Sequence, residues 1–194
     1  AMRILSAAFP AALVMVAVGV PMGVQAGGPT GDASSSQTSV ARGAYLVNTI
    51  GCADCHTPFK AGPTGPEPDF SRGLSGHPQG QVLRAPAASK GPWIWGGSGT
   101  NTAFWGPWGV SYAANLTPDA TGLGHWTPEQ FVQAMRNGKH PGTGRPIAPP
   151  MPWQHFAQLT DADLQAMVAY LKSQPPVRNA VPDYQPPAAA AGKP

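Results

Sequence analysis

The chain has 194 residues, a formal net charge of +3 and 11% charged residues, so neither sign of charge dominates. Its Lys and Arg residues are scattered singly, which excludes the basic clusters that bind nucleic acid. Glycine and proline number 24 each, and this abundance predicts little regular secondary structure for a chain of this length. Only two cysteines are present, so any role that uses both leaves none for a disulfide.

Residues 1–26 have the features of an export segment. An apolar run from Ile4 to Val20 follows the single charge at Arg3, and Val24-Gln25-Ala26 resembles a small-residue signal-peptide cleavage site. The alternative is a retained membrane anchor, because the stretch after Arg3 is uncharged and long enough as a helix to span a bilayer. Both interpretations predict a folded part outside the cytoplasm, either free in the periplasm or anchored facing it.

The next segment leads into a first helix. Residues 27–37 are small and polar and predict a flexible linker. Thr38 or Ser39 can cap a helix that follows, and this helix is expected to end near Gly51.

Directly after this helix the sequence reads Cys52-Ala53-Asp54-Cys55-His56, the C-x-x-C-H motif that attaches a c-type haem. The thiols of Cys52 and Cys55 can add to the two haem vinyl groups, and His56 can bind the iron as one axial ligand. A thioredoxin-like redox pair would follow a strand in a βαβ pattern, and a zinc site would need two more closely spaced ligands. The sequence shows neither feature, so the motif predicts one covalent haem.

Residues 57–124 are expected to be irregular, because repeated Pro and Gly residues interrupt any long helix or strand. Four tryptophans lie among glycines in this stretch, at Trp93, Trp95, Trp105 and Trp108. They predict a loop that its aromatic side chains hold against the core. The functional alternative is a docking surface or a cover over the haem.

Two further helices are expected, with no convincing strand anywhere. Thr127 and Gln130 form a capping box that opens a helix ending at Gly138. The last helix starts at Thr160, carries an apolar stripe with i, i+3, i+4, i+7 spacing, and stops at Pro175. Residues 184–194 are rich in Pro and Ala and predict a disordered tail.

The second axial ligand is expected to be Met151. It lies in a proline-rich loop, Pro149-Pro150-Met151-Pro152, which is stiff enough to hold a thioether on the iron without a helix, with Pro150 beside the cofactor. Met135 and Met167 fall on the apolar stripes of helices and are expected in the core. The remaining candidates are histidines, of which the first two are the fallback ligands: His140, His155, His77 and His125.

These features resemble the monohaem class I cytochrome c family, and more closely the periplasmic cytochrome c domains and subunits of bacterial dehydrogenases. The similar blocks are Arg42 to Val47, Gly51 to Pro58, Ala113 to Asp119, Thr121 to Gly124, Trp126-Thr127, the methionine loop and the end of the last helix. The Trp-rich insertion matches nothing in the family.

The resemblance implies an all-α fold, with a cytochrome c domain at residues 38–183 whose first and last helices cross. Gly43 would then allow close approach to Tyr170. His56 and Met151 would be the axial ligands, and Asn115 would bond a haem propionate.

The function expected from the ligands and the resemblance is electron transfer rather than catalysis, because six-coordinate iron has no open position. Its partners would be a dehydrogenase or quinol-oxidising donor and an oxidase or other acceptor. Two alternatives remain: a haem-bearing subunit of a larger membrane-associated redox complex, or a haem enzyme or gas sensor with a labile sixth ligand.

Overall fold

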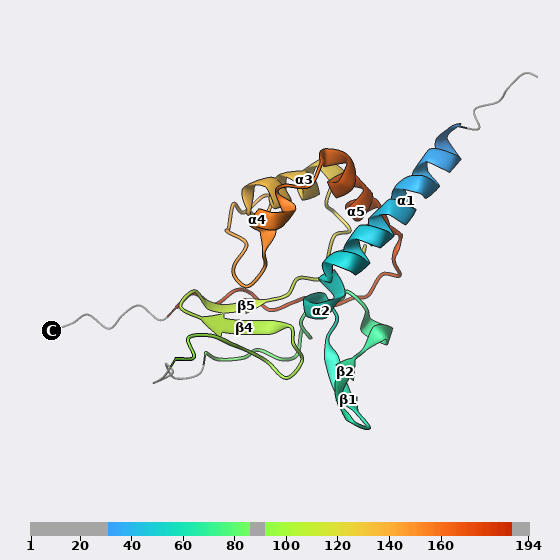
Figure 1. Ribbon diagram of the computed structural model, residues 1–194. Helices are drawn as coiled ribbons and strands as arrows, with labels where there is room; N and C mark the ends of the chain where they lie inside the picture. The colour runs from blue at the N-terminus through green and yellow to red at the C-terminus, as the bar shows by residue number, and fades with distance from the viewer. Residues whose placement is uncertain (1–30, 86–91, 188–194) are drawn as a thin grey trace, which may run out of the picture. The chain divides into compact units, whose positions relative to one another are not determined.

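The computed structural model describes residues 31–85 and 92–187, so the expected leader at residues 1–26 lies outside the described part. Its helices pack together in one region and its short strands in another (Figure 1). The elements in chain order are α1 (Gly31–Ile50), α2 (Cys52–His56), β1 (Phe59–Gly62), β2 (Gly65–Pro68), η1 (Phe70–Arg72), β3 (Gly96–Gly97), β4 (Ala103–Gly106), β5 (Gly109–Tyr112), α3 (Pro128–Asn137), α4 (Trp153–Phe156) and α5 (Asp161–Ser173).

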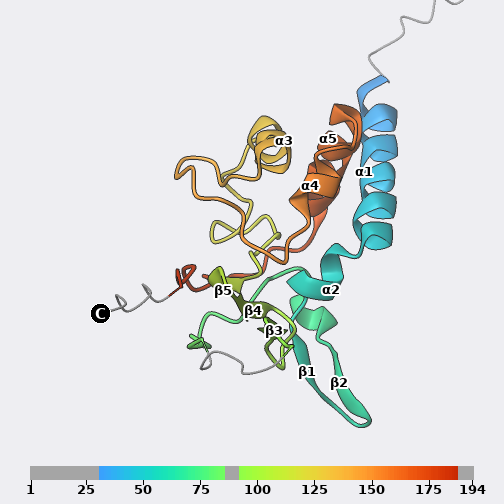
Figure 2. The same ribbon diagram turned by 60° about the vertical axis from the view of Figure 1, so that its left-hand side comes forward.

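Helices α1 and α5 lie side by side in both views (Figures 1 and 2). Gly43 makes this packing possible, because a Cβ atom there would lie 1.9 Å from the Ala166 carbonyl oxygen and 2.8 Å from Cβ of Tyr170. The expected close approach of Gly43 and Tyr170 is therefore confirmed. An ion pair between Arg42 and Asp163, at 2.9 Å, joins the same two helices at their surface.

The apolar core joins α1, α3 and α5 to the loop segments between them. Met135 and Met167 are buried in it, as their positions on helix stripes predict. The caps of α3 also agree with the sequence: Thr127 and Gln130 form the capping box, and Gly138 ends the helix at a φ of 61°. Within the described ranges, no helix combines the length and the apolar character needed to cross a membrane.

The prediction of an all-α fold is wrong. The segment after α2 forms two antiparallel sheets, one of β1 and β2 and one of β3, β4 and β5 in that order, so the fold is mixed α and β. These strands have at most four residues, too few for an alternating pattern to stand out. Prolines at positions 66 and 68 are tolerated in β2 because both strands of a two-stranded sheet are edges.

Two predicted boundaries also differ. Helix α1 starts at Gly31, so residues 31–37 of the expected linker are helical. These small polar residues carry no apolar stripe, and a helix that is already nucleated extends through them without one. At the other end, Gln185 pairs with Val110 of β5 through two backbone hydrogen bonds, of 2.8 and 3.0 Å. The chain is therefore held beyond residue 184, while residues 188–194 of the expected tail lie outside the described part.

Candidate functional site

The C-x-x-C-H motif forms the short helix α2. Its residue His56 is buried, and its Nδ1 donates a hydrogen bond to the carbonyl oxygen of Ala114 at 2.7 Å. Because a carbonyl only accepts, this bond puts the ring proton on Nδ1 and leaves Nε2 deprotonated. Burial lowers the pKa of His56 and favours the neutral ring, the form that binds metals.

The loop segments around α2 fix its position. The amide of Asn101 donates to the carbonyl oxygen of Asp54 at 2.8 Å, and the backbone N–H of Gly76 donates to the carbonyl oxygen of His56 at 2.8 Å. The hydroxyl of Thr57 accepts from the backbone N–H of Leu74 at 3.0 Å. The insertion predicted to be irregular is therefore an ordered support for the motif.

Both cysteines are free thiols in partly buried positions. Burial raises the pKa of Cys52 to about 11 and also raises the pKa of Cys55. Both groups are therefore protonated at neutral pH and carry the S–H hydrogen that addition to a vinyl group requires. Cys55 lines the cavity described next, whereas Cys52 packs against the edge of the hydrophobic core.

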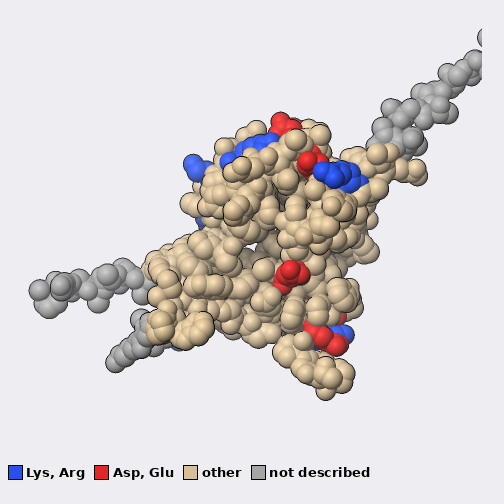
Figure 3. Space-filling model, in the orientation of Figure 1, with Lys and Arg blue, Asp and Glu red and all other residues tan. Residues whose placement is uncertain are grey.

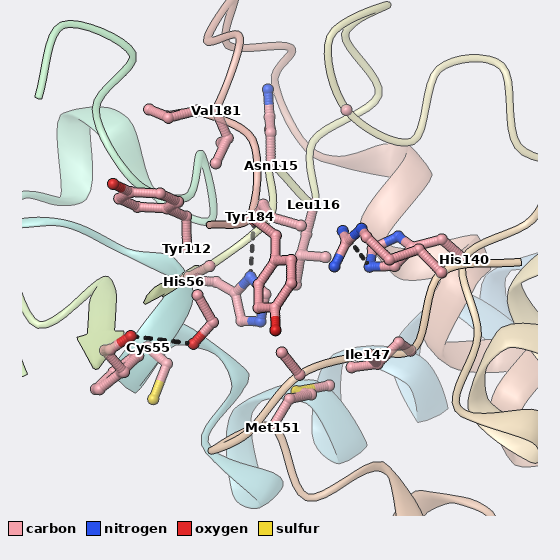
Figure 4. A pocket seen from close by; sticks show the side chains of 18 of the residues that line it. Cys55, His56, Tyr112, Asn115, Leu116, His140, Ile147, Met151, Val181 and Tyr184 are labelled. Carbon is pink, nitrogen blue, oxygen red and sulfur yellow. Dashed lines mark hydrogen bonds between the residues drawn. The ribbon is translucent and has the colours of Figure 1, made fainter. Parts of the chain in front are cut away.

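A cavity of about 470 Å³ lies beside α2. Both His56 and Met151 extend into it, from segments far apart in the sequence (Figure 4). Pro150, expected beside the cofactor, lines the same cavity. The rest of the wall is mainly apolar, and it comes from β4 and β5, α3, the methionine loop and residues 180–184.

These residues fit a haem c. The cavity brings together a thiol, an imidazole nitrogen and a thioether, which are the donor atoms for covalent attachment and axial ligation. Among the described residues His56 Nε2 has no hydrogen-bond partner, and its tautomer is held by a backbone carbonyl, as is usual for a metal-binding histidine.

Comparison with known proteins agrees with this chemistry. A family model described as cytochrome c matches residues 40–175. The chain belongs to the cytochrome c family. Membership implies a covalently attached haem and makes the matched region an electron-transfer module rather than a catalyst.

Three relatives of this cytochrome are named as parts of dehydrogenases. They are a nicotinate dehydrogenase subunit of Pseudomonas putida, 33% identical over 93% of this chain and 13% of the relative; the fructose dehydrogenase cytochrome subunit of Gluconobacter japonicus, 29% over 83% and 26%; and the quinone-dependent alcohol dehydrogenase cytochrome c subunit of Gluconobacter oxydans, 27% over 70% and 21%. The cytochrome spans about a quarter or less of the length of each.

The other sequence candidates for the second axial position divide clearly. His77 and Met167 are buried away from the cavity lining, and His125 and His155 lie outside that lining as well. His77 is held by Thr102 and by the carbonyl oxygen of Gln81. Met135 and His140 do line the cavity, so position alone leaves them beside Met151 as possible ligands.

The side chain of Asn115 serves the protein rather than a ligand. Its Nδ2 donates to Thr121 Oγ1 and to the carbonyl oxygens of Val177 and Asn179, and its Oδ1 accepts from the backbone and hydroxyl of Thr117. Figure 4 shows the amide pointing away from the cavity centre. The expectation that Asn115 bonds a propionate therefore finds no free donor at this side chain.

Sequence reasoning missed three contributors to the site. The carbonyl of Ala114 left no signal, since every residue carries one. Arg145 is the one Lys or Arg among the described residues that line the cavity, and Tyr184 lies on the same wall. Both come from segments that turns and prolines mark only as loops. A spacing pattern does not reveal which loops fold over a cavity.

Proposed function

We propose that this protein carries one haem c, joined through Cys52 and Cys55, with His56 and Met151 as its axial ligands. It shuttles electrons in the periplasm from a dehydrogenase or quinol-oxidising complex to a terminal acceptor. The observation that carries the proposal is that His56 and Met151 share one apolar cavity next to the C-x-x-C-H helix. The two cysteines of the chain suffice for one attachment.

When bound, the haem supplies one-electron chemistry at its iron. Each cysteine contributes an S–H that adds across a vinyl double bond, which forms a carbon–sulfur bond and needs no oxidant. His56 keeps its proton on Nδ1, where the Ala114 carbonyl holds it, and offers Nε2 to the metal. Met151 offers a soft sulfur, which favours the reduced metal relative to a second histidine.

A place within a dehydrogenase complex is the second candidate function. It is favoured by the relatives, which are named as dehydrogenase subunits, and by an uncharged surface region. Residues 92–118, which include β3 to β5, contain no Asp, Glu, Lys or Arg, whereas charged side chains gather over the helices in Figure 3. Charge depletion is typical of the centre of a protein–protein interface. Stoichiometric co-purification with substrate-dependent reduction of the haem would support this assignment.

The test of the ligand pair is an optical spectrum of the purified holoprotein, oxidised and reduced, with and without carbon monoxide. Wild type is expected to show a sharp reduced c-type spectrum, a methionine-to-ferric charge-transfer band and no carbon monoxide binding. Met151→Ala should lose the band and bind carbon monoxide. Met135→Leu is the matched control, because Met135 also lines the cavity, and it should keep the band.

Other outcomes separate the alternatives. A spectrum unchanged in Met151→Ala would reject Met151 as the ligand, and loss of the band in Met135→Leu would transfer the role to Met135. Ready binding of carbon monoxide by the wild-type protein would favour a haem enzyme or gas sensor with a labile sixth ligand. Absence of a covalent haem spectrum would reject the proposal as a whole.

A further inference from the structure

The Trp-rich insertion has a structural connection to the methionine loop. Strands β4 and β5 place Phe104, Ser111 and Tyr112 on the cavity wall, and the loop containing Met151 forms another part of that wall. A direct hydrogen bond joins these two parts: the hydroxyl of Ser111 donates to the carbonyl oxygen of Pro149 at 2.6 Å. The donor belongs to the insertion, and the acceptor lies two residues before Met151.

This hydrogen bond is the principal polar restraint on the methionine loop. Prolines at 149, 150 and 152 lack an N–H, so the loop has few donors of its own. The N–H of Ile147 bonds the carbonyl of Gly138 at 2.7 Å, and the Pro152 carbonyl accepts from His155 at 3.0 Å. Between these two bonds, residues 148–151 receive a hydrogen bond from Ser111 alone among the described residues.

The Ser111 hydroxyl is itself held in place. The side chain is 8% exposed, and the indole N–H of Trp108 donates to its oxygen at 3.3 Å. Because the oxygen accepts from Trp108, its hydrogen is directed to Pro149, and the alternative acceptor, the Phe104 carbonyl, lies farther away at 3.3 Å. Trp95 packs against Trp108, with ring centroids 6.5 Å apart.

Strand β5 is also fixed on both of its edges. It pairs with β4 on one side, where Phe104 is opposite Ser111, and with Gln185 through Val110 on the other. A Cβ atom at Gly109 would lie 2.0 Å from the Gln185 carbonyl oxygen, so this contact requires glycine. The strand that carries Ser111 is therefore a rigid base for the hydrogen bond.

We propose that Ser111 is a positioning residue that holds the methionine loop so that the Met151 thioether stays on the haem iron. The insertion then acts as a clamp on the sixth ligand, a role that its tryptophans support by fixing Ser111. This inference rests on the proposed function, since it requires Met151 to be an axial ligand. It explains why a segment outside the family pattern is ordered at the cavity.

The test uses imidazole as a competing ligand for the ferric holoprotein. Imidazole binds where the methionine has left, so its apparent Kd falls as the fraction of methionine-free protein rises. Ser111→Ala removes the hydrogen bond and is expected to lower the apparent Kd by about 5- to 30-fold, with a weaker methionine charge-transfer band. Trp108→Phe, which keeps an aromatic ring and removes the N–H, should shift it in the same direction by less.

Two comparisons distinguish positioning from general damage. Ser71→Ala, which removes a hydroxyl bonded to Asp69 outside the cavity lining, should leave the apparent Kd unchanged. In a Met151→Ala background, Ser111→Ala should have no further effect, because there is no methionine to displace. An equal effect of Ser111→Ala in both backgrounds, or none in wild type, overturns the inference. If Met151→Ala leaves imidazole affinity unchanged, the proposed ligand pair fails first.

Discussion

Arg145 donates a hydrogen bond from Nη2 to Nε2 of His140 at 2.8 Å, and both residues line the haem cavity. Burial and the neighbouring guanidinium lower the pKa of His140 to about 4, which keeps it a neutral acceptor at pH 7. The guanidinium also lies over the ring of Tyr184, 5.6 Å from its centroid. None of the ion pairs found among the described residues includes Arg145, so its charge faces the cavity without a carboxylate in contact.

Arg145→Gln is expected to lower the midpoint reduction potential of the holoprotein. A positive charge beside the cavity favours the reduced haem, which has one less positive charge than the oxidised form. Potentiometric titration followed by absorbance measures the shift. Arg42→Gln removes the same charge from the α1–α5 surface and should shift the potential less. Equal shifts in the two variants would show that only net charge matters.

Asn115→Ala is expected to lower the free energy of unfolding by about 2–4 kcal/mol, because it removes several buried hydrogen bonds and leaves their partners unsatisfied. The affected partners are the carbonyl of Val177 and the groups of Thr117. Denaturant unfolding of the holoprotein provides the measurement. Unchanged stability together with an altered pH dependence of the potential would instead support the propionate role.

Gly43→Ala should lower the free energy of unfolding by about 2 kcal/mol or more, since overpacking of this kind forces two backbones apart. The new Cβ would meet the Ala166 carbonyl at 1.9 Å, and that atom belongs to a helix and does not move freely. Gly99→Ala is the control, because a Cβ there has no neighbour within 4 Å. Similar losses from the two changes would contradict the packing argument.

Protonation of His77 should destabilise the fold at mildly acidic pH. Burial lowers the pKa of His77 below its ordinary value of 6.5, so the unfolded state takes up the proton first as pH falls. The stabilisation is complete above pH 6.5 and declines as pH falls from there toward the folded-state pKa. Unfolding free energies of wild type and His77→Asn at pH 7 and pH 5 should show a steeper decline in wild type. Parallel declines would exclude His77 as the cause.

The parts of the fold that follow from local patterns were predictable. The capping box at Thr127 and Gln130 is a short-range hydrogen-bond arrangement, and the stripe on the last helix has a spacing that only a helix turns into one face. The all-α prediction failed at β4 and β5 because four-residue strands depend on partners for their stability. Val110, for example, pairs with Gln185, which is 75 positions farther along the chain.

The site divides in the same way. The sequence alone determined that Cys52, Cys55 and His56 form one haem-attachment motif and that Met151 lies in a stiff loop, because these features depend on residue type and adjacent spacing. Only the tertiary structure decided that Ala114 orients His56, that Ser111 restrains Pro149, and that Arg145 rather than Asn115 faces the cavity with donors to spare. These contacts join segments far apart in sequence, and their hydrogen-bond geometry exists only once the chain has folded.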